Sequence, residues 1–442
     1  MGESPHDRQL RPVAAIQGHD AYRVARHPAP VDLWLAGNEG RAPAREVLTA
    51  LSDESPELLR RYPSAGALEA RLAARLDVDP TWVLVTAGAD DALDRTCRAM
   101  LAPGREMVLP VPTFEMLDRY ASLTGADVRR VPWSPSGPYP RAAVLEAINE
   151  RTAVVAVVSP NNPTGAVATA DDVRALAAAA PHALILIDGA YDEFAEERLT
   201  EVALTLPNAL LTRTLSKAYG VAGLRVGYAV GQHVAWLRRT GNPYAVSSVS
   251  LALAARRLDD TEGMTHYVAE VKRERDDLLA RLRDYDFDPP RSQGNFVFVR
   301  DRRTDWLGDG LAGLGIAVRR WPGHPELADA MRITVPGVAA DYERLVHGIA
   351  ATLRPEAILF SRPELEGAVF TARAAVVGPE TGISGTLASL GVTRAWMVGD
   401  TPEDMAAARA AGVVPIGWGA TSLVEAGAAR VMTSLDALQG WA

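Results

Sequence analysis

The sequence predicts an α/β protein in three parts: a large domain with a mostly parallel sheet, a smaller α+β domain and a short C-terminal α/β domain. Between residues 80 and 230, short apolar runs alternate with helical stretches, as expected for strands that are buried on both faces of a parallel sheet. Between residues 231 and 353, one long charged helix precedes three strands. A new apolar strand follows Leu353-Arg354-Pro355, so we place a domain boundary there.

Each expected element follows from its local pattern. The large domain, residues 41–230, contains strand candidates at 82–86, 106–109, 153–158, 183–187 and 209–212, with a helix at 169–180. The smaller domain, residues 231–353, contains a helix at 261–283 and strands at 295–300, 316–320 and 331–335. Residues 1–40 form an N-terminal arm that we expect to pack on the smaller domain or on a partner subunit. The last domain covers residues 355–442 and begins with a strand at 357–360.

Composition excludes several classes of protein. The chain is 48% hydrophobic and 23% charged, which is ordinary for a globular protein in water. It has no apolar run of the ~18 residues that span a membrane and no signal-peptide core in residues 1–12, so we expect a cytoplasmic protein. The single cysteine, Cys97, excludes an intramolecular disulfide and is expected in a helix core. A net charge of −9 argues against nucleic acid as a partner.

The segment around Lys217 carries the strongest chemical signal. It reads Thr214-Leu215-Ser216-Lys217-Ala218-Tyr219-Gly220, and Arg225 follows. A lysine among small and hydroxyl residues suits a Schiff base with an aldehyde cofactor, and hydroxyls with an arginine suit the cofactor's phosphate. Taken alone, the heptapeptide is equally consistent with a surface lysine in a glycine-rich loop.

Two upstream motifs give this lysine a context. The turn Ser159-Pro160-Asn161-Asn162-Pro163-Thr164-Gly165 follows a predicted strand. Asp188 ends the next strand, Tyr191 lies just beyond it, and Lys217 follows the strand after that. In order and spacing, these motifs resemble the class I/II aminotransferases of pyridoxal phosphate (PLP) fold type I, most closely the histidinol-phosphate aminotransferase branch. The resemblance covers about residues 30 to 350.

The resemblance implies roles at the cofactor ring. Lys217 would form the internal aldimine with PLP, and Asp188 would keep the pyridine nitrogen protonated, so that the ring acts as an electron sink. Asn162 and Tyr191 would hydrogen-bond the ring 3′ oxygen, and Phe114 would stack on the ring face. Catalysis would rest on Lys217, Asp188 and Tyr191.

The resemblance also implies a phosphate site that spans two subunits. Its donors would be the backbone N–H groups of Ala89 and Asp90 at a helix start and the side chains of Thr214, Ser216 and Arg225. Tyr62 matches a tyrosine that reaches the phosphate across a dimer interface, so a homodimer is implied.

Substrate residues are implied in the same way. Arg332 matches the arginine that binds the α-carboxylate. Asn38 resembles a residue lining the site, although Gly40 stands where the family often has proline. Arg319 matches a position linked to a distal phosphate, but adjacent arginines at a strand end are equally consistent with a solvated surface. Asn295 lies in a matching segment without an assigned role.

The implied activity is amino transfer from histidinol phosphate or a related amino acid to a keto acid. Lys217 would move a proton between the substrate Cα and the cofactor C4′. The same residues also suit a PLP-dependent elimination or carbon–carbon bond-forming enzyme of specialised metabolism, because substrate geometry selects the bond that breaks. A non-enzymatic regulator on the same fold is a third alternative.

The last domain carries a second resemblance. Met397-Val398-Gly399-Asp400-Thr401-Pro402-Glu403-Asp404 resembles the Mg²⁺ motif of haloacid dehalogenase-like (HAD) phosphatases, in which Asp400 and Asp404 would hold the cation. However, Ser361 and Pro363 stand where that family has two aspartates, and the segment 377–382 lacks a lysine. We therefore expect a degenerate, truncated HAD-like domain without phosphatase activity; vestigial metal binding by Asp400 and Asp404 is the alternative. Its expected job is structural: packing on the aminotransferase, extending the dimer or covering a substrate.

Overall fold

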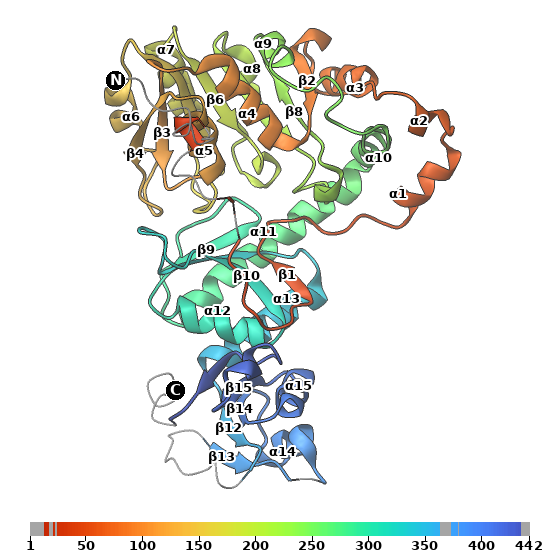
Figure 1. The fold of residues 1–442 in the computed structure, drawn as a ribbon, viewed down its shortest axis with the longest axis vertical. Helices are drawn as coiled ribbons and strands as arrows, with labels where there is room; N and C mark the ends of the chain where they lie inside the picture. The colour runs from red at the N-terminus through yellow and green to blue at the C-terminus, as the bar shows by residue number, and fades with distance from the viewer. Residues whose placement is uncertain (1–12, 17–20, 23, 363–372, 379, 435–442) are drawn as a thin grey trace, which may run out of the picture. The chain divides into compact units, whose positions relative to one another are not determined.

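The chain divides into two compact units. A computed structural model describes residues 13–16, 21–22, 24–362, 373–378 and 380–434. The first unit comprises Met1–Arg23 and Ala42–Thr261, and the second comprises Val24–Arg41 and Glu262–Ala442 (Figure 1). Among the described residues, no helix is long and apolar enough to cross a membrane.

The first unit is built on a seven-stranded sheet in the order β2-β8-β7-β6-β5-β3-β4. β8 runs antiparallel to both its neighbours and the other pairs are parallel, which confirms the mostly parallel sheet expected from the sequence. The strands are β2 (Val83–Thr86), β3 (Glu106–Val111), β4 (Asp127–Pro132), β5 (Thr152–Val158), β6 (Leu184–Asp188), β7 (Ala209–Thr214) and β8 (Gly227–Val230).

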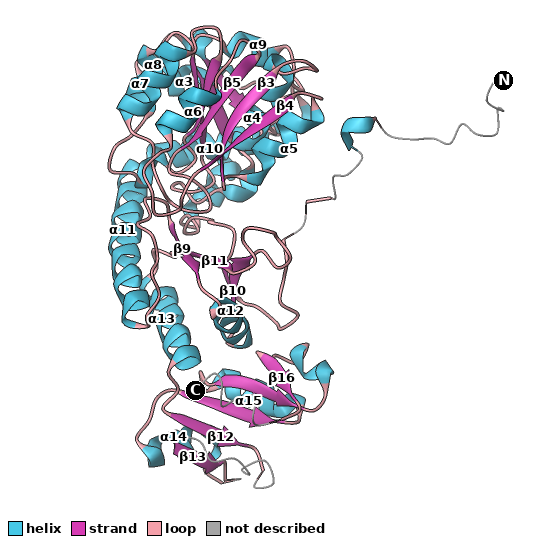
Figure 2. Ribbon diagram, turned by 90° about the vertical axis from the view of Figure 1, so that its left-hand side faces the viewer, coloured by secondary structure: helices cyan, strands magenta, loops and turns pink. Residues whose placement is uncertain are grey.

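Helices lie on both sides of this sheet (Figure 2). α4 packs against α5 and α9, whereas α7 packs against α6 and α8. The capping box that Thr169 and Asp172 form fixes the start of α7. The helices are α1 (Glu46–Thr49), α2 (Glu57–Arg60), α3 (Gly66–Leu76), α4 (Gly88–Met100), α5 (Glu115–Leu123), α6 (Arg141–Ala147), α7 (Ala170–Ala179), α8 (Thr200–Thr205), α9 (Val234–Arg238) and α10 (Ser248–Asp259).

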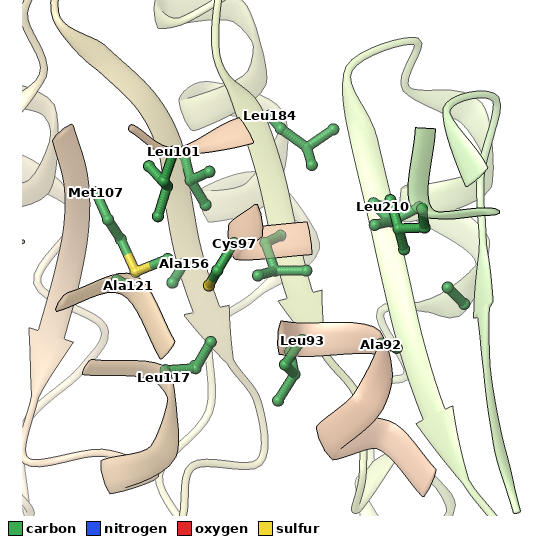
Figure 3. Close-up of a cluster of buried hydrophobic side chains, with 14 of the residues drawn as sticks. Ala92, Leu93, Cys97, Leu101, Met107, Leu117, Ala121, Ala156, Leu184 and Leu210 are labelled. Carbon is green, nitrogen blue, oxygen red and sulfur yellow. The ribbon is translucent and has the colours of Figure 1, made fainter. Parts of the chain in front are cut away.

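A buried apolar cluster joins α4 and α5 to the sheet. Leu93 and Cys97 of α4 meet Leu117 of α5 and Met107 of β3 in this cluster (Figure 3). Cys97 is fully buried, as the sequence predicts, and burial raises the pKa of its thiol to about 12. The thiol therefore stays neutral and acts as a small apolar side chain.

The second unit begins with a four-stranded sheet in the order β1-β10-β11-β9. β1 pairs parallel to β10, so this part of the N-terminal segment packs on the smaller sheet. The elements are β1 (Leu33–Leu35), β9 (Phe296–Arg300), β10 (Ile316–Arg320) and β11 (Ala330–Thr334), with α11 (Thr261–Asp284), α12 (Thr304–Gly313) and α13 (Ala339–Leu353).

The C-terminal residues of this unit, which we call the C-terminal module (residues 355–434), form a five-stranded parallel sheet in the order β13-β12-β14-β15-β16. β12 occupies Ala357–Phe360, as predicted. The other elements are β13 (Arg373–Val376), β14 (Ala395–Gly399), β15 (Val414–Trp418), β16 (Arg430–Met432), α14 (Gly382–Leu390) and α15 (Pro402–Ala410).

The two aspartates of the HAD-like motif have partners within the module. Asp404 completes the N-terminal capping box of α15 with Thr401, and it also accepts a hydrogen bond of 3.1 Å from the Asp400 N–H. The other partner of Asp400 is Arg362, with which its carboxylate forms an ion pair. Pro363, the second replaced position, lies outside the described residues. The HAD-like assignment remains a prediction.

Candidate active site

Five loops of the first unit converge at one edge of its sheet. β2, β3, β5, β6 and β7 run in the same direction, so their carboxyl ends share this edge. Residues Gly88–Asp90 follow β2, Phe114 follows β3, Asn162 follows β5, Asp188 ends β6 and Thr214 ends β7. In open parallel sheets, ligands bind outside the carboxyl ends of the strands. The structure therefore brings these predicted cofactor residues to the edge where a ligand is expected, whereas Tyr62 is not among them.

Asp188, Tyr191 and Lys217 lie together at this edge. Burial raises the pKa of the Asp188 carboxyl to about 6, against smaller opposing effects from the Ala190 N–H bond and the charge of Lys217. The Ala190 N–H donates to Asp188 Oδ1 at 3.1 Å. Lys217 Nζ lies 5.9 Å from the centre of the Tyr191 ring. A buried carboxylate and an amine thus share one small region.

A second group of donors surrounds the start of α4. Thr214 Oγ1 donates to Ser216 Oγ at 2.9 Å, and Arg225 Nη1 lies 3.5 Å from the same Ser216 oxygen. Arg225 Nη2 also reaches Asp90 Oδ2 at 3.2 Å. The backbone of Arg225 has φ 52°, a left-handed conformation that is costly for a side chain of this kind and is concentrated at functional sites.

Two glycines make room for this arrangement. A Cβ on Gly88, where φ is +81°, would lie 2.7 Å from Arg225 Nη2. A Cβ on Gly227 would lie 2.6 Å from the Ala89 nitrogen. Larger residues at either position would push the guanidinium away or displace the first turn of α4.

The loops after β3 and β5 are tied together by Asn161, which the sequence reading assigned no role. Asn161 is fully buried, accepts a hydrogen bond from Thr113 Oγ1 at 2.7 Å and donates one to Pro112 O at 2.9 Å. It thereby fixes the segment before Phe114 against the segment before Asn162. Its position beside Asn162 in a proline-rich turn was the available signal.

A buried ionic cluster under the Tyr191 loop was also missed. Arg213, on β7, donates to Asp192 at 3.0 Å and to Glu193 at 2.5 Å. All three side chains are at most 9% exposed. Asp192 and Glu193 directly follow Tyr191, so the cluster fixes that loop to the strand that leads to Lys217. An arginine within an apolar strand, two residues after Leu211, was the signal.

We expect Arg213→Met to lower the free energy of unfolding of the first unit by about 3 to 5 kcal/mol, because two carboxylates would remain buried without their cation. Denaturant titration measures the loss. A triple variant that adds Asp192→Asn and Glu193→Gln should recover most of it. If the triple variant is as unstable as the single one, the ionic cluster is not the cause.

The predicted substrate residues of the second unit form their own group. Arg319 on β10 and Arg332 on β11 are register partners in an antiparallel pair, and both are under 10% exposed. Their guanidinium carbons lie 5.2 and 6.0 Å from the Trp321 ring centre. Like charges directly opposite each other destabilise a sheet, so this pairing favours a site for anions.

Asn38 lies beside Arg332 in this group. Asn38, with φ 53°, is fully buried, and its N–H donates to Thr334 Oγ1 at 3.0 Å. Asn295 Nδ2 donates to Asn38 O at 3.2 Å, which gives Asn295 a positioning contact. Arg332 Nη2 donates to Ala36 O at 2.6 Å. The segment 36–38 is thus bound to β11, which carries Arg332, and to Asn295, which immediately precedes β9.

Comparison with known proteins identifies the family. Residues 33–349 match the model of the family "Aminotransferase class I and II". The chain belongs to this family. It is therefore a PLP-dependent transferase.

Several known aminotransferases are similar to this chain over more than two thirds of its length. Histidinol-phosphate aminotransferase 1 of Trichormus variabilis is 34% identical over 71% of this chain and 89% of its own. An aromatic amino acid aminotransferase of Corynebacterium efficiens is 32% identical over 71% of this chain and 91% of its own. The structure of histidinol-phosphate aminotransferase from Sinorhizobium meliloti in complex with pyridoxal-5′-phosphate has a TM-score of 0.70 at 24% identity, covering 79% of this chain and 99% of that chain.

The residues of this aminotransferase fit a PLP molecule chemically. The raised pKa of Asp188 marks a buried carboxyl short of positive charge, which a protonated ring nitrogen would supply. Thr214, Ser216, Arg225 and the start of α4 supply donors of the kind that a phosphate needs. Lys217 and Lys272 are the two lysines of the whole sequence, so few amines are available for the aldehyde.

Tyr62 lies at the surface of the first unit. Its side chain is 79% exposed and stacks on Tyr244, with ring centres 4.5 Å apart. Leu48 and Leu59, which both precede it in sequence, are 64% and 77% exposed. Exposed apolar side chains in this part of the first unit, residues 48–62, suit an interface with another chain.

Proposed function

We propose that this aminotransferase transfers the amino group of histidinol phosphate, or of a related amino acid, to a keto acid. The observation that carries the proposal is the paired burial of Arg319 and Arg332, which suits substrates with anionic groups. The histidinol-phosphate aminotransferases among its relatives support the same substrate class.

At the cofactor, we assign the following roles to this chain's residues. PLP, when bound, withdraws electrons from the substrate Cα and so stabilises negative charge there. Asp188 holds a proton on the ring nitrogen, Asn162 and Tyr191 hydrogen-bond the ring 3′ oxygen, and Phe114 covers the ring face. The N–H groups of Ala89 and Asp90, together with Thr214, Ser216 and Arg225, bind the phosphate.

Lys217 supplies both the covalent attachment and the proton transfer. The Lys217 amine would take the proton from the substrate Cα and deliver it to the cofactor carbon C4′. Its place after β7, beside the buried Asp188 and Tyr191, suits both tasks because the amine lies next to the residues assigned to the cofactor ring. We propose that the enzyme is a homodimer in which Tyr62 reaches the phosphate of the partner subunit.

At the substrate, Arg332 binds the α-carboxylate of the amino acid or keto acid, and Arg319 binds a second anionic group. Asn38 lines the same site. We also propose that the C-terminal module is a degenerate HAD-like domain. Its all-parallel sheet and the engagement of Asp400 by Arg362 support that assignment.

Replacing Arg332 tests the carboxylate assignment. We expect Arg332→Gln to raise KM for the keto acid about 100-fold, equal to about 3 kcal/mol, because two charge-assisted hydrogen bonds are lost. Steady-state kinetics with 2-oxoglutarate measure this. Arg300→Gln on β9 is the matched control, since Arg300 pairs with Asp329 at the surface and should leave KM unchanged. Equal KM values in both variants would contradict the assignment.

A donor panel tests the substrate. The holoenzyme is assayed with 2-oxoglutarate and with histidinol phosphate, histidinol, phenylalanine, tyrosine or aspartate as donor. The proposal predicts the highest kcat/KM for histidinol phosphate and a much lower value for histidinol, because Arg319 would lose its anion. Equal turnover of the two would remove the phosphate-binding role of Arg319, and no turnover of any donor would contradict the proposed substrate class.

A further inference from the structure

The C-terminal module shares a core with the smaller domain. Trp306 of α12 and Trp396 of β14 meet edge to face, with ring centres 5.1 Å apart. Trp396 Nε1 donates to Ala351 O of α13 at 2.9 Å. A single buried cluster contains both tryptophans together with Ile358 and Val414 of the module. The module and the smaller domain therefore pack as one body.

The module also binds residues that precede β1. We call residues 27–38, which include β1, the strap. Arg409 of α15 donates to Pro30 O at 2.6 Å and forms an ion pair with Asp32. Asp32 is also bound by both Nη atoms of Arg344 of α13, each at 2.8 Å. Arg409 thus reaches from the module to a carboxylate that the smaller domain already holds.

A second contact binds the start of the strap. His27 Nδ1 accepts a hydrogen bond from the Ala29 N–H at 3.1 Å, so Nε2 carries the proton that is donated to Ala429 O, also at 3.1 Å. Burial lowers the pKa of His27, which keeps this neutral form. Ala429 immediately precedes β16, so the module holds the strap at two points, residues 27 and 30–32.

The other end of the strap reaches the anion site. Three residues of β1 separate Asp32 from Ala36, whose carbonyl accepts the 2.6 Å hydrogen bond from Arg332. Asn38 follows, bound to Thr334 two residues after Arg332. A shift of the strap along β10 would therefore move the carbonyl that orients the Arg332 guanidinium.

We infer that the C-terminal module is a positioning clamp for the substrate arginine. Arg409 and Ala429 hold the strap in the register that sets Arg332 through Ala36. Arg409 is a positioning residue, because it acts only through Asp32, Pro30 and the strand that follows them. The inference rests on the proposed function in one respect, namely that Arg332 binds the carboxylate of the substrate.

Solvent limits the expected size of the effect. The Arg409 and Asp32 side chains are 25% and 56% exposed, and exposed ion pairs contribute little. β1 is also held by its pairing with β10, which does not involve Arg409. We therefore expect Arg409→Met to raise KM for 2-oxoglutarate about three- to fivefold. The value of kcat and the cofactor absorbance should stay at those of the wild type, since no cofactor residue is touched.

Arg394→Met in the same full-length holoenzyme is the matched control. Arg394 also lies in the module, and it pairs with Glu356 at 3.0 Å within the module. It should leave KM at the wild-type value. If Arg409→Met and Arg394→Met give the same KM, or if both lower kcat, the clamp is contradicted and the module is a general support of the fold.

Hydrogen–deuterium exchange tests the clamp without any substrate. The N–H groups of Asp32 and Leu33 both donate to Gly315 O at 3.0 Å and report on the strap. Arg409→Met should speed their exchange several-fold, whereas the amides of β14 in the module should keep wild-type rates. Unchanged exchange at residues 32 and 33 would overturn the inference. Because this measurement needs no substrate, failure of the clamp can be told apart from failure of the proposed function.

Discussion

We expect Lys217→Ala to abolish amino transfer and covalent cofactor attachment. The loss in kcat is expected to exceed about 1,000-fold, because in the proposed mechanism one side chain supplies both the covalent link and the general base. Treatment of the wild-type holoenzyme with borohydride, followed by peptide mass spectrometry, should place the reduced cofactor on Lys217. The variant should bind PLP without any reducible link and should keep the fold of the first unit.

The sequence offers one internal control for this result. Lys272, on α11, is the other lysine, so Lys272→Ala should keep the reducible link and the activity of the wild type. Reduced cofactor on Lys272 in the wild-type protein would contradict the assignment. So would a reducible link that persists in Lys217→Ala.

Asp188→Asn gives the second large effect. We expect kcat to fall about 100- to 1,000-fold, as when one preorganised charge partner is removed from an active site. The asparagine keeps the shape of the side chain but cannot hold a proton on the ring nitrogen, so the cofactor withdraws electrons less strongly. KM should change much less than kcat. A variant with wild-type kcat would show that Asp188 does not serve the ring.

The same pair of proteins tests the pKa of Asp188 without cofactor. Because burial raises this pKa from 3.8 to about 6, the folded apoprotein binds a proton that the unfolded chain releases. The bound proton stabilises the fold. Its contribution to the free energy of unfolding is complete below pH ~4 and is lost as pH rises through ~6, at about 1.4 kcal/mol per pH unit. From pH 4 to 7, wild-type apoprotein should therefore lose about 2 kcal/mol relative to Asp188→Asn. A constant difference between the two proteins would refute the raised pKa.

The sequence predicted the strands that are buried on both faces, because their apolar runs are continuous. The predicted strand at residues 153–158 lies within β5, and the one at residues 357–360 coincides with β12. β4 was missed because it is an edge strand in which Asp127, Arg129 and Arg130 are exposed, so no apolar run marks it. β1 was missed because three residues give too little pattern, and its pairing with β10 is a long-range contact.

The candidate site was likewise predicted in part from the sequence. Motif order predicted the residues at the carboxyl ends of the strands, since Asn162 follows β5, Asp188 ends β6 and Lys217 follows β7. Sequence order does not reveal which side chains meet across strands. The register of Arg319 with Arg332 and the ion pairs of Arg213 depend on pairing between distant segments. The proposed clamp likewise depends on a long-range contact, because Arg409 and its partner Asp32 are 377 positions apart in the chain.

The most direct test of the central claim follows the cofactor through a single half-reaction. Purified PLP-bound enzyme is mixed with excess histidinol phosphate without any keto acid, and the cofactor and products are quantified by absorbance and mass spectrometry. Amino transfer predicts one equivalent of pyridoxamine phosphate and one of the carbonyl product per active site, with PLP restored when 2-oxoglutarate is added. Products that accumulate beyond one equivalent while the cofactor returns to PLP would contradict amino transfer and would indicate elimination or carbon–carbon bond chemistry instead.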